Sequence, residues 1–183
     1  MRRMGSRSPM MTTVQGRCKA PSAAYRHFAD RQALPDAVCS VAMANLAMAM
    51  EAELAEVPVG GDRVDTARAR LRAIGTGYLR FVREQPGLFR TAFSATENLR
   101  SAASPSRAGE SGLTPFQLLG AALDGLVEAG VLPRERRPDA EVLAWSAVHG
   151  LAMLLVEGPL RGLGDARAQD AWRRLLDMVE RGL

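Results

Sequence analysis

A chain of 183 residues, 47% hydrophobic and 5% aromatic, is long enough for one globular domain or for a small module joined to a larger one. Two cysteines, Cys18 and Cys39, provide neither a disulfide framework nor a metal-ligand spacing, and no apolar run of the secretory kind follows the N-terminal arginines, so we expect a cytoplasmic protein. The net charge of +4 excludes no class of soluble protein until the charges are placed along the chain.

The basic residues gather at the N-terminal end of the chain. Residues 1–34 contain seven basic residues and one acidic residue, whereas the rest has a slight acidic excess. Residues 1–21 show no periodicity, and we expect a disordered or degenerate segment there. A basic end on a near-neutral body suggests a segment that faces a polyanion, with nucleic acid as the first candidate. A solvated basic tail is the alternative.

Apolar periodicity predicts helices along the rest of the chain. A short segment at 22–28 precedes Asp30, which we expect to cap a long helix that ends near Ala55. Further helices are predicted at about 64–84 and 87–95, followed by a Ser/Gly/Pro-rich loop at 97–112.

Three more helices are predicted in the C-terminal half. Thr114 and Pro115 begin a helix that runs to Ala129, Asp139 caps one that reaches Glu157, and the last spans about 167–181. The most apolar run, 142–156, is short for a membrane span, so we expect no membrane contact. No segment alternates as a strand does, and the sequence therefore predicts an all-α fold, a helical bundle.

The stretch from Ala23 to Leu34 (AAYRHFADRQAL) carries the first specific pattern. It resembles the end of the helix-turn-helix in TetR-type transcriptional regulators, where a recognition helix closes in Tyr-x-His-Phe before a long helix. By that resemblance, small side chains face base edges, and hydroxyl, imidazole and guanidinium groups reach phosphates. The DNA-binding residues it implies are Ala23, Ala24, Tyr25, Arg26, His27 and Arg31.

The resemblance also implies a division of the chain. Residues 22–34 are then a remnant of a helix-turn-helix, and residues 35–183 form a helical ligand-sensing and dimerisation domain. The family places two further helices before the recognition helix, and residues 1–21 show neither. Two hypotheses follow: a ligand-responsive transcriptional regulator, a repressor by family precedent, or a degenerate or truncated member that acts as a dimeric small-molecule-binding module without specific DNA binding.

Two further stretches resemble TetR-type sensor domains. Residues 78–93 contain a Tyr-x-x-Phe run with Pro-x-Leu-Phe after it, and residues 145–150 match the Trp-x-x-x-His-Gly signature that names one C-terminal subclass. We expect a mainly apolar pocket for a small hydrophobic effector, although solid core packing is the alternative for aromatics at this spacing. The candidate lining residues are Met50, Tyr78, Phe81, Phe89, Phe93, Phe116, Trp145, His149 and Met153.

The segments at 139–157 and 167–181 carry more apolar surface than one core needs, which predicts a homodimer. Candidate interface residues are Leu143, Ala147, Gly150, Leu154, Trp172, Leu175, Leu176 and Val179. His149 alone among apolar neighbours is either a hydrogen-bonded structural residue or a ligand contact. No catalytic or metal-binding constellation is visible, so we expect neither an enzyme nor a cofactor.

Overall fold

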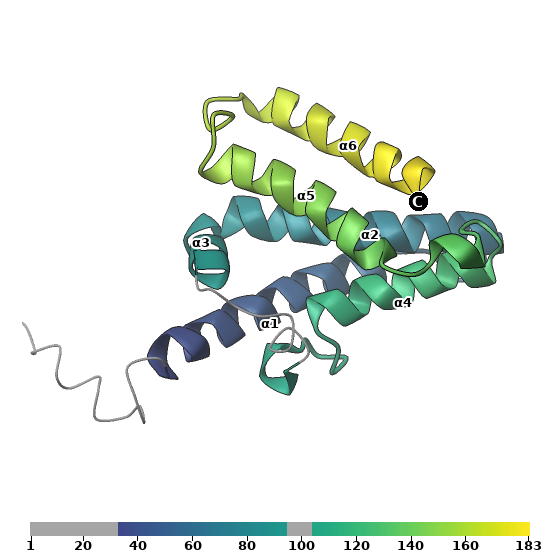
Figure 1. Ribbon diagram of the computed structural model, residues 1–183, viewed down its shortest axis with the longest axis horizontal. Helices are drawn as coiled ribbons and strands as arrows, with labels where there is room; N and C mark the ends of the chain where they lie inside the picture. Colours follow the sequence, from purple (N-terminus) through teal and green to yellow (C-terminus); the bar gives the residue numbers. More distant parts are fainter. Residues whose placement is uncertain (1–32, 95–103) are drawn as a thin grey trace, which may run out of the picture.

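The computed structural model describes residues 33–94 and 104–183. Over these ranges the chain is helical and contains no strand, which confirms the all-α fold (Figure 1). The helices are α1 (Ala33–Ala55), α2 (Arg63–Glu84), α3 (Pro86–Ser94), η3 (Pro105–Arg107), α4 (Pro115–Glu128), η4 (Arg134–Arg136), α5 (Ala140–Val156) and α6 (Asp165–Gly182).

Helix α2 is the centre of the bundle and contacts each of the other five α-helices of the described chain. Its apolar residues recur every three or four positions, so they form a continuous stripe. The stripe predicted from the sequence is buried, with Leu71, Ile74, Tyr78, Phe81 and Val82 all in the core. The other helices are arranged around this stripe.

Helices α1 and α2 cross closely at Gly77. A Cβ atom at this position would lie 2.5 Å from the Cα of Met50 and 2.6 Å from the carbonyl oxygen of Ala49. Backbone atoms cannot move aside as the end of a flexible side chain can, so only glycine allows this distance. The crossing holds Met50 fully buried against α2.

The helix ends follow the sequence in most places. Thr114 forms the expected N-cap of α4, and Gln117 completes a capping box with it. Asp139 precedes α5 as expected, but its backbone is left-handed (φ 59°) and its side chain makes no capping hydrogen bond, so its predicted role as a side-chain cap is wrong. The predicted loop at 97–112 contains the short helix η3, which lies against α1.

A carboxylate on α1 holds the segment after η3. Glu51 accepts hydrogen bonds from the backbone N–H groups of Glu110 (2.9 Å) and Ser111 (3.0 Å). Gly109 passes so close to this carboxylate that a Cβ there would collide with it. The connection between η3 and α4 is therefore tied to the C-terminal part of α1.

Within the described chain, Leu34–Ala55 is long and apolar enough to cross a membrane by length and composition alone. Helix α1 nevertheless places Leu46, Ala47 and Met50 in the protein core and packs against α2, α3 and α4. One third of the apolar segment is buried inside the protein, whereas Val41 and Met48 on α1 are exposed.

Helices α5 and α6 form an antiparallel pair on one side of α2 (Figure 1). Only Ala140, Ala144, Ala152 and Val156 of α5 are buried, although the helix is apolar on every side. Helix α6 is amphipathic, and ion pairs from Arg72 of α2 to Asp177 and Glu180, both at 2.6 Å, join its charged side to α2. Much of the apolar surface of α5 is not covered by the other described residues of the chain.

Candidate functional site

Six ring side chains gather where α2, α3, α4 and α5 meet. Their neighbouring ring centroids lie between 4.5 Å (Phe93 to His149) and 6.5 Å (Tyr78 to His149) apart. All six were predicted to line one site, and the structure brings them together. This aromatic cluster consists of Tyr78, Phe89, Phe93, Phe116, Trp145 and His149.

A hydrogen bond between two of these rings provides the polar contact inside the cluster. The Tyr78 hydroxyl oxygen lies 2.7 Å from Nδ1 of His149, which joins α2 to α5. Burial raises the pKa of the Tyr78 phenol and lowers the pKa of the His149 imidazole. Both groups are therefore neutral at pH 7 and form an uncharged hydrogen-bonding pair in apolar surroundings.

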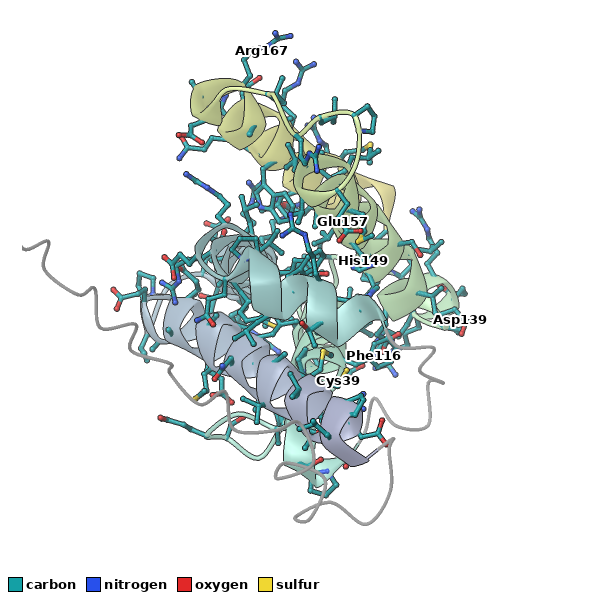
Figure 2. All side chains as sticks on the ribbon, turned by 90° about the vertical axis from the view of Figure 1, so that its left-hand side faces the viewer. Cys39, Phe116, Asp139, His149, Glu157 and Arg167 are labelled. Atoms are coloured by element: carbon teal, nitrogen blue, oxygen red, sulfur yellow. The ribbon has the colours of Figure 1, made fainter. Side chains whose placement is uncertain are left out.

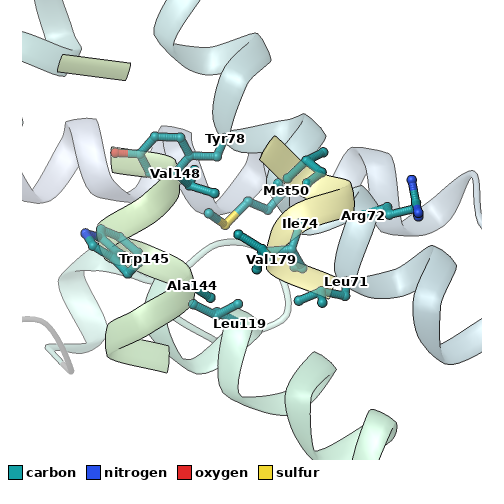
Figure 3. Close-up of a pocket in the computed structure, with 12 residues that line it drawn as sticks. Met50, Leu71, Arg72, Ile74, Tyr78, Leu119, Ala144, Trp145, Val148 and Val179 are labelled. Atoms are coloured by element: carbon teal, nitrogen blue, oxygen red, sulfur yellow. The ribbon is translucent and has the colours of Figure 1, made fainter. Parts of the chain in front are cut away.

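A small cavity of about 30 Å³ adjoins this pair (Figure 3). Met50 of α1 reaches into it between Trp145 on one side and Ile74 on the other. The Arg72 guanidinium points away from the cavity toward its ion-pair partners on α6. The volume is that of roughly one water molecule, so a larger molecule enters only if the surrounding side chains move apart.

The nine predicted pocket residues divide into three groups. Met50, Tyr78 and Trp145 line the cavity. The other four rings adjoin it: His149 is bound to Tyr78, Phe89 and Phe93 contact His149, and Phe116 contacts Trp145. Met153 is half-buried against the core, and Phe81 is buried on α2 without a ring contact to the cluster among the described residues. The cavity also has an aliphatic lining that sequence reasoning missed, including Leu71, Leu119, Val148, Leu176 and Val179.

His149 lies halfway along α5, between the labelled Asp139 and Glu157 (Figure 2). The proposed interface residues on the outer side of this helix are exposed, with Leu143 at 64% and Leu154 at 42% of full exposure. Gly150 is also exposed, and Ala147 is half-buried.

The interface candidates on α6 differ from one another in burial. Trp172 and Val179 are buried within the chain itself, and Leu176 packs against Gly75 of α2. Leu175 is half-buried, and the neighbouring Met178, which was not predicted, is 57% exposed. The inner stripe of α6 thus serves the core of one chain, and a second stripe next to it stays open.

The predicted DNA-binding residues, Ala23 to His27 and Arg31, lie outside the described residues. Within 33–94 and 104–183, no group of three or more His, Cys, Asp or Glu side chains could hold a metal ion. Cys39 is buried, and its thiol points at the carbonyl oxygens of Thr91 and Ala92 in α3.

Residues 71–179 match the family described as the tetracyclin repressor-like C-terminal domain. This range runs from α2 into α6 and contains the whole aromatic cluster. A solved structure of a protein with unknown function from Rhodococcus sp. RHA1 is similar to this chain, with a TM-score of 0.65 and 24% identity over 90% of this chain and 78% of that one; this likeness shows a shared fold. No curated protein matches the chain. By the family match over residues 71–179, the chain belongs to the TetR-type regulators with a tetracyclin repressor-like C-terminal domain.

Proposed function

We propose that the chain is a ligand-responsive, DNA-binding transcriptional regulator, a repressor, whose effector binds at the aromatic cluster. The observation that carries this proposal is the neutral Tyr78–His149 hydrogen bond enclosed by aromatic rings. A small hydrophobic effector needs apolar walls and one or two polar groups that fix its orientation, and the cluster has both. In this proposal the protein acts in the cytoplasm, without catalytic activity and without a cofactor.

Helix α1 connects the aromatic cluster to the proposed DNA-binding segment, so a movement at the cluster can change DNA affinity. Met50 of α1 lies in the cavity, and Gly77 holds α1 and α2 in close contact at the same level. An effector that enlarges the cavity by displacing Met50 or Trp145 pushes on α1 or on α5. The proposed recognition residues, Ala23 to Arg31, directly precede α1. The effector changes DNA affinity only by its difference in affinity for the two positions of α1.

A homodimer is part of the proposal, because a regulator of this kind presents two recognition helices to successive major grooves. The unpartnered apolar side of α5 and the adjacent stripe of α6 support it, with Leu143, Gly150 and Leu154 on α5 and Leu175 and Met178 on α6. Nothing lies within 4 Å of a Cβ built on Gly150, so a second helix can approach closely there. Two copies would pack these helices as a four-helix bundle across a two-fold axis.

The test is DNA binding by the 183-residue protein to fragments from upstream of the neighbouring genes, at physiological salt and with competitor DNA. We expect competitor-resistant binding that a hydrophobic effector releases, and loss of that binding in Tyr25→Ala and His27→Ala. The effector comes from a panel of hydrophobic compounds screened by fluorescence quenching in the Trp172→Phe variant, in which Trp145 is the only tryptophan of the sequence.

Two outcomes contradict this proposal in different ways. Saturable quenching together with only salt-sensitive, sequence-blind DNA binding would favour the dimeric small-molecule-binding module. No saturable quenching by any compound, with the protein shown to be folded by circular dichroism, would remove the aromatic cluster as the effector site.

A further inference from the structure

A groove much larger than the central cavity runs between α2 and α6. It consists of two adjoining hollows of about 800 Å³ and 290 Å³, which share Leu79, Arg83, Asp165 and Gln169. The first extends along α2 and the N-terminal half of α6, and the second reaches α3 and the connection between α5 and α6. We call both together the α2–α6 groove.

The floor of the α2–α6 groove is apolar. Leu79 and Val82 of α2, Val156 of α5 and Trp172 of α6 line it and are each at least nine-tenths buried. Half-buried Leu160 and Leu163 extend this floor along the connection before α6. An alkyl chain lying here would replace water over a continuous hydrocarbon surface.

The end of the groove next to α3 has spare positive charge. Arg83 reaches Asp165 only at 4.0 Å, and the Asp165 side chain is 93% exposed. Arg90 pairs with Glu157 at 3.3 Å. The Arg161 side chain makes no ion pair or hydrogen bond with any described residue.

Arg72 and Arg80, in the first hollow, are held by closer ion pairs. Glu53 pairs with Arg80 at 2.6 Å, and Arg72 is bound by Asp177 and Glu180. Glu84 and Asp165 are the remaining acidic residues that line it. The hollow next to α3 is therefore lined by three arginines and one acidic residue, Asp165, beside an apolar floor.

We propose that the α2–α6 groove binds an amphipathic anion, a carboxylate on an extended alkyl chain. The carboxylate lies among Arg83, Arg90 and Arg161, because guanidinium groups match the geometry of a carboxylate with paired N–H donors. The alkyl chain lies along the floor over Leu79 and Trp172.

This groove is separate from the proposed dimer interface. At 100° per residue, Gln169, Arg173 and Leu176 lie on one flank of α6, whereas Leu175 and Met178 lie on the other. Dimerisation through the second flank leaves the groove open. No ring of the aromatic cluster lines the groove, which meets the central cavity only at Arg72 and Leu176 among the described residues.

Isothermal titration of the full chain with decanoate, 1-decanol and decyltrimethylammonium, each below its aggregation concentration, tests the proposal. We expect saturable decanoate binding that weakens with salt, weaker binding of decanol and weakest binding of the cation. Arg83→Gln and Arg161→Gln should each weaken decanoate binding about threefold to fivefold, the upper part of the range for exposed ion pairs, and leave decanol binding unchanged. Arg134→Gln, in η4 and away from the groove, is the matched control and should have no effect.

The Arg161 side chain makes no ion pair or hydrogen bond with the described residues, so its substitution tests the site without a loss of folding. Equal binding of decanoate and decanol, unchanged decanoate affinity in both arginine variants, or no decanoate binding would each overturn the proposal. Loss of decanoate binding in Tyr78→Phe would also overturn it, because it would move the ligand to the aromatic cluster.

Discussion

Replacing Gly77 by alanine tests whether the close crossing of α1 and α2 supports the aromatic cluster. The added methyl group would lie 2.5 Å from the Cα of Met50, far inside van der Waals contact, and all three of its nearest neighbours are backbone atoms of Ala49 and Met50. The two helices must therefore move apart at this point, and Met50 and Tyr78, which are next to it, lose part of their packing.

Two effects of opposite sign decide the size of the change. Alanine in place of glycine within a helix stabilises by up to about 1 kcal/mol. Overpacking of a close contact costs about 1–3 kcal/mol, and more where backbone rather than a side chain must yield. We expect the second effect to prevail for Gly77→Ala, with a net loss of about 2 kcal/mol in the free energy of unfolding and a fall in Tm of roughly 4–8 °C for a chain of this length.

Urea unfolding followed by circular dichroism measures this change, with Gly125→Ala in α4 as the matched control. A Cβ on Gly125 would meet nothing within 4 Å, so that variant should be neutral or up to about 1 kcal/mol more stable. Gly77→Ala at least as stable as the wild type would show that the crossing is loose, and the proposed coupling between the cavity and α1 would lose its structural basis.

The remaining predictions concern the His149 pair and the dimer. Tyr78→Phe removes the hydroxyl bound to Nδ1 of His149 and should cost about 1 kcal/mol of stability in urea unfolding. Because burial lowers the pKa of folded His149, the unfolded chain binds more protons just below the ordinary histidine pKa of about 6.5. Stability should therefore be constant above that pH and fall as the pH decreases through it, and His149→Gln, followed by thermal melts from pH 8 to 5, should remove this part of the loss. Sedimentation equilibrium at micromolar concentration should give twice the chain mass of 19.7 kDa for the wild type and a monomer for Gly150→Glu or Leu154→Arg; a monomeric wild type would contradict the dimer.

Much of the fold could be predicted because the signals that define helices are local. The apolar stripe of α2 and the start of α4 at Thr114 and Pro115 can each be predicted from residues that are neighbours in the sequence. The aromatic cluster could also be predicted in outline, since Trp145 and His149 are one helical turn apart and share a face. The resemblance to TetR-type sensor domains supplied the expectation that rings of α2 and α3 face the same site.

The cavity lining and the packing of α6 could not be predicted, because they depend on contacts between segments that are far apart in the sequence. Leu119, Val148 and Leu176 line the cavity from three different helices, and the local sequence of each helix does not indicate that these residues meet. The apolar stripe of α6 could equally have faced the core or a partner, because both environments select the same side chains. Its packing against α2, where Leu176 meets Gly75, directs Trp172 and Val179 inward. The hydrogen bonds from Glu110 and Ser111 to Glu51 join residues about sixty positions apart, so no local sequence pattern predicts them.

The size of the central cavity predicts how its ligand affinity responds to a core substitution. A cavity of about 30 Å³ is far below the roughly 300–1,000 Å³ of a typical small-molecule site, so binding must be accompanied by opening. Every 1.4 kcal/mol spent on opening lowers the apparent affinity about tenfold. Met50→Ala removes the buried side chain that fills this space, at a cost of about 2–5 kcal/mol in stability.

For a compound that quenches Trp145, Met50→Ala should therefore bind more tightly than the wild type, by tenfold or more, while it unfolds at lower urea concentration. Affinity and stability would change in opposite directions, because the substitution supplies part of the opening that the ligand otherwise brings about. If Met50→Ala binds the compound more weakly and still unfolds cooperatively, Met50 is a direct ligand contact instead. The effector would then act on α1 by attracting Met50, not by displacing it.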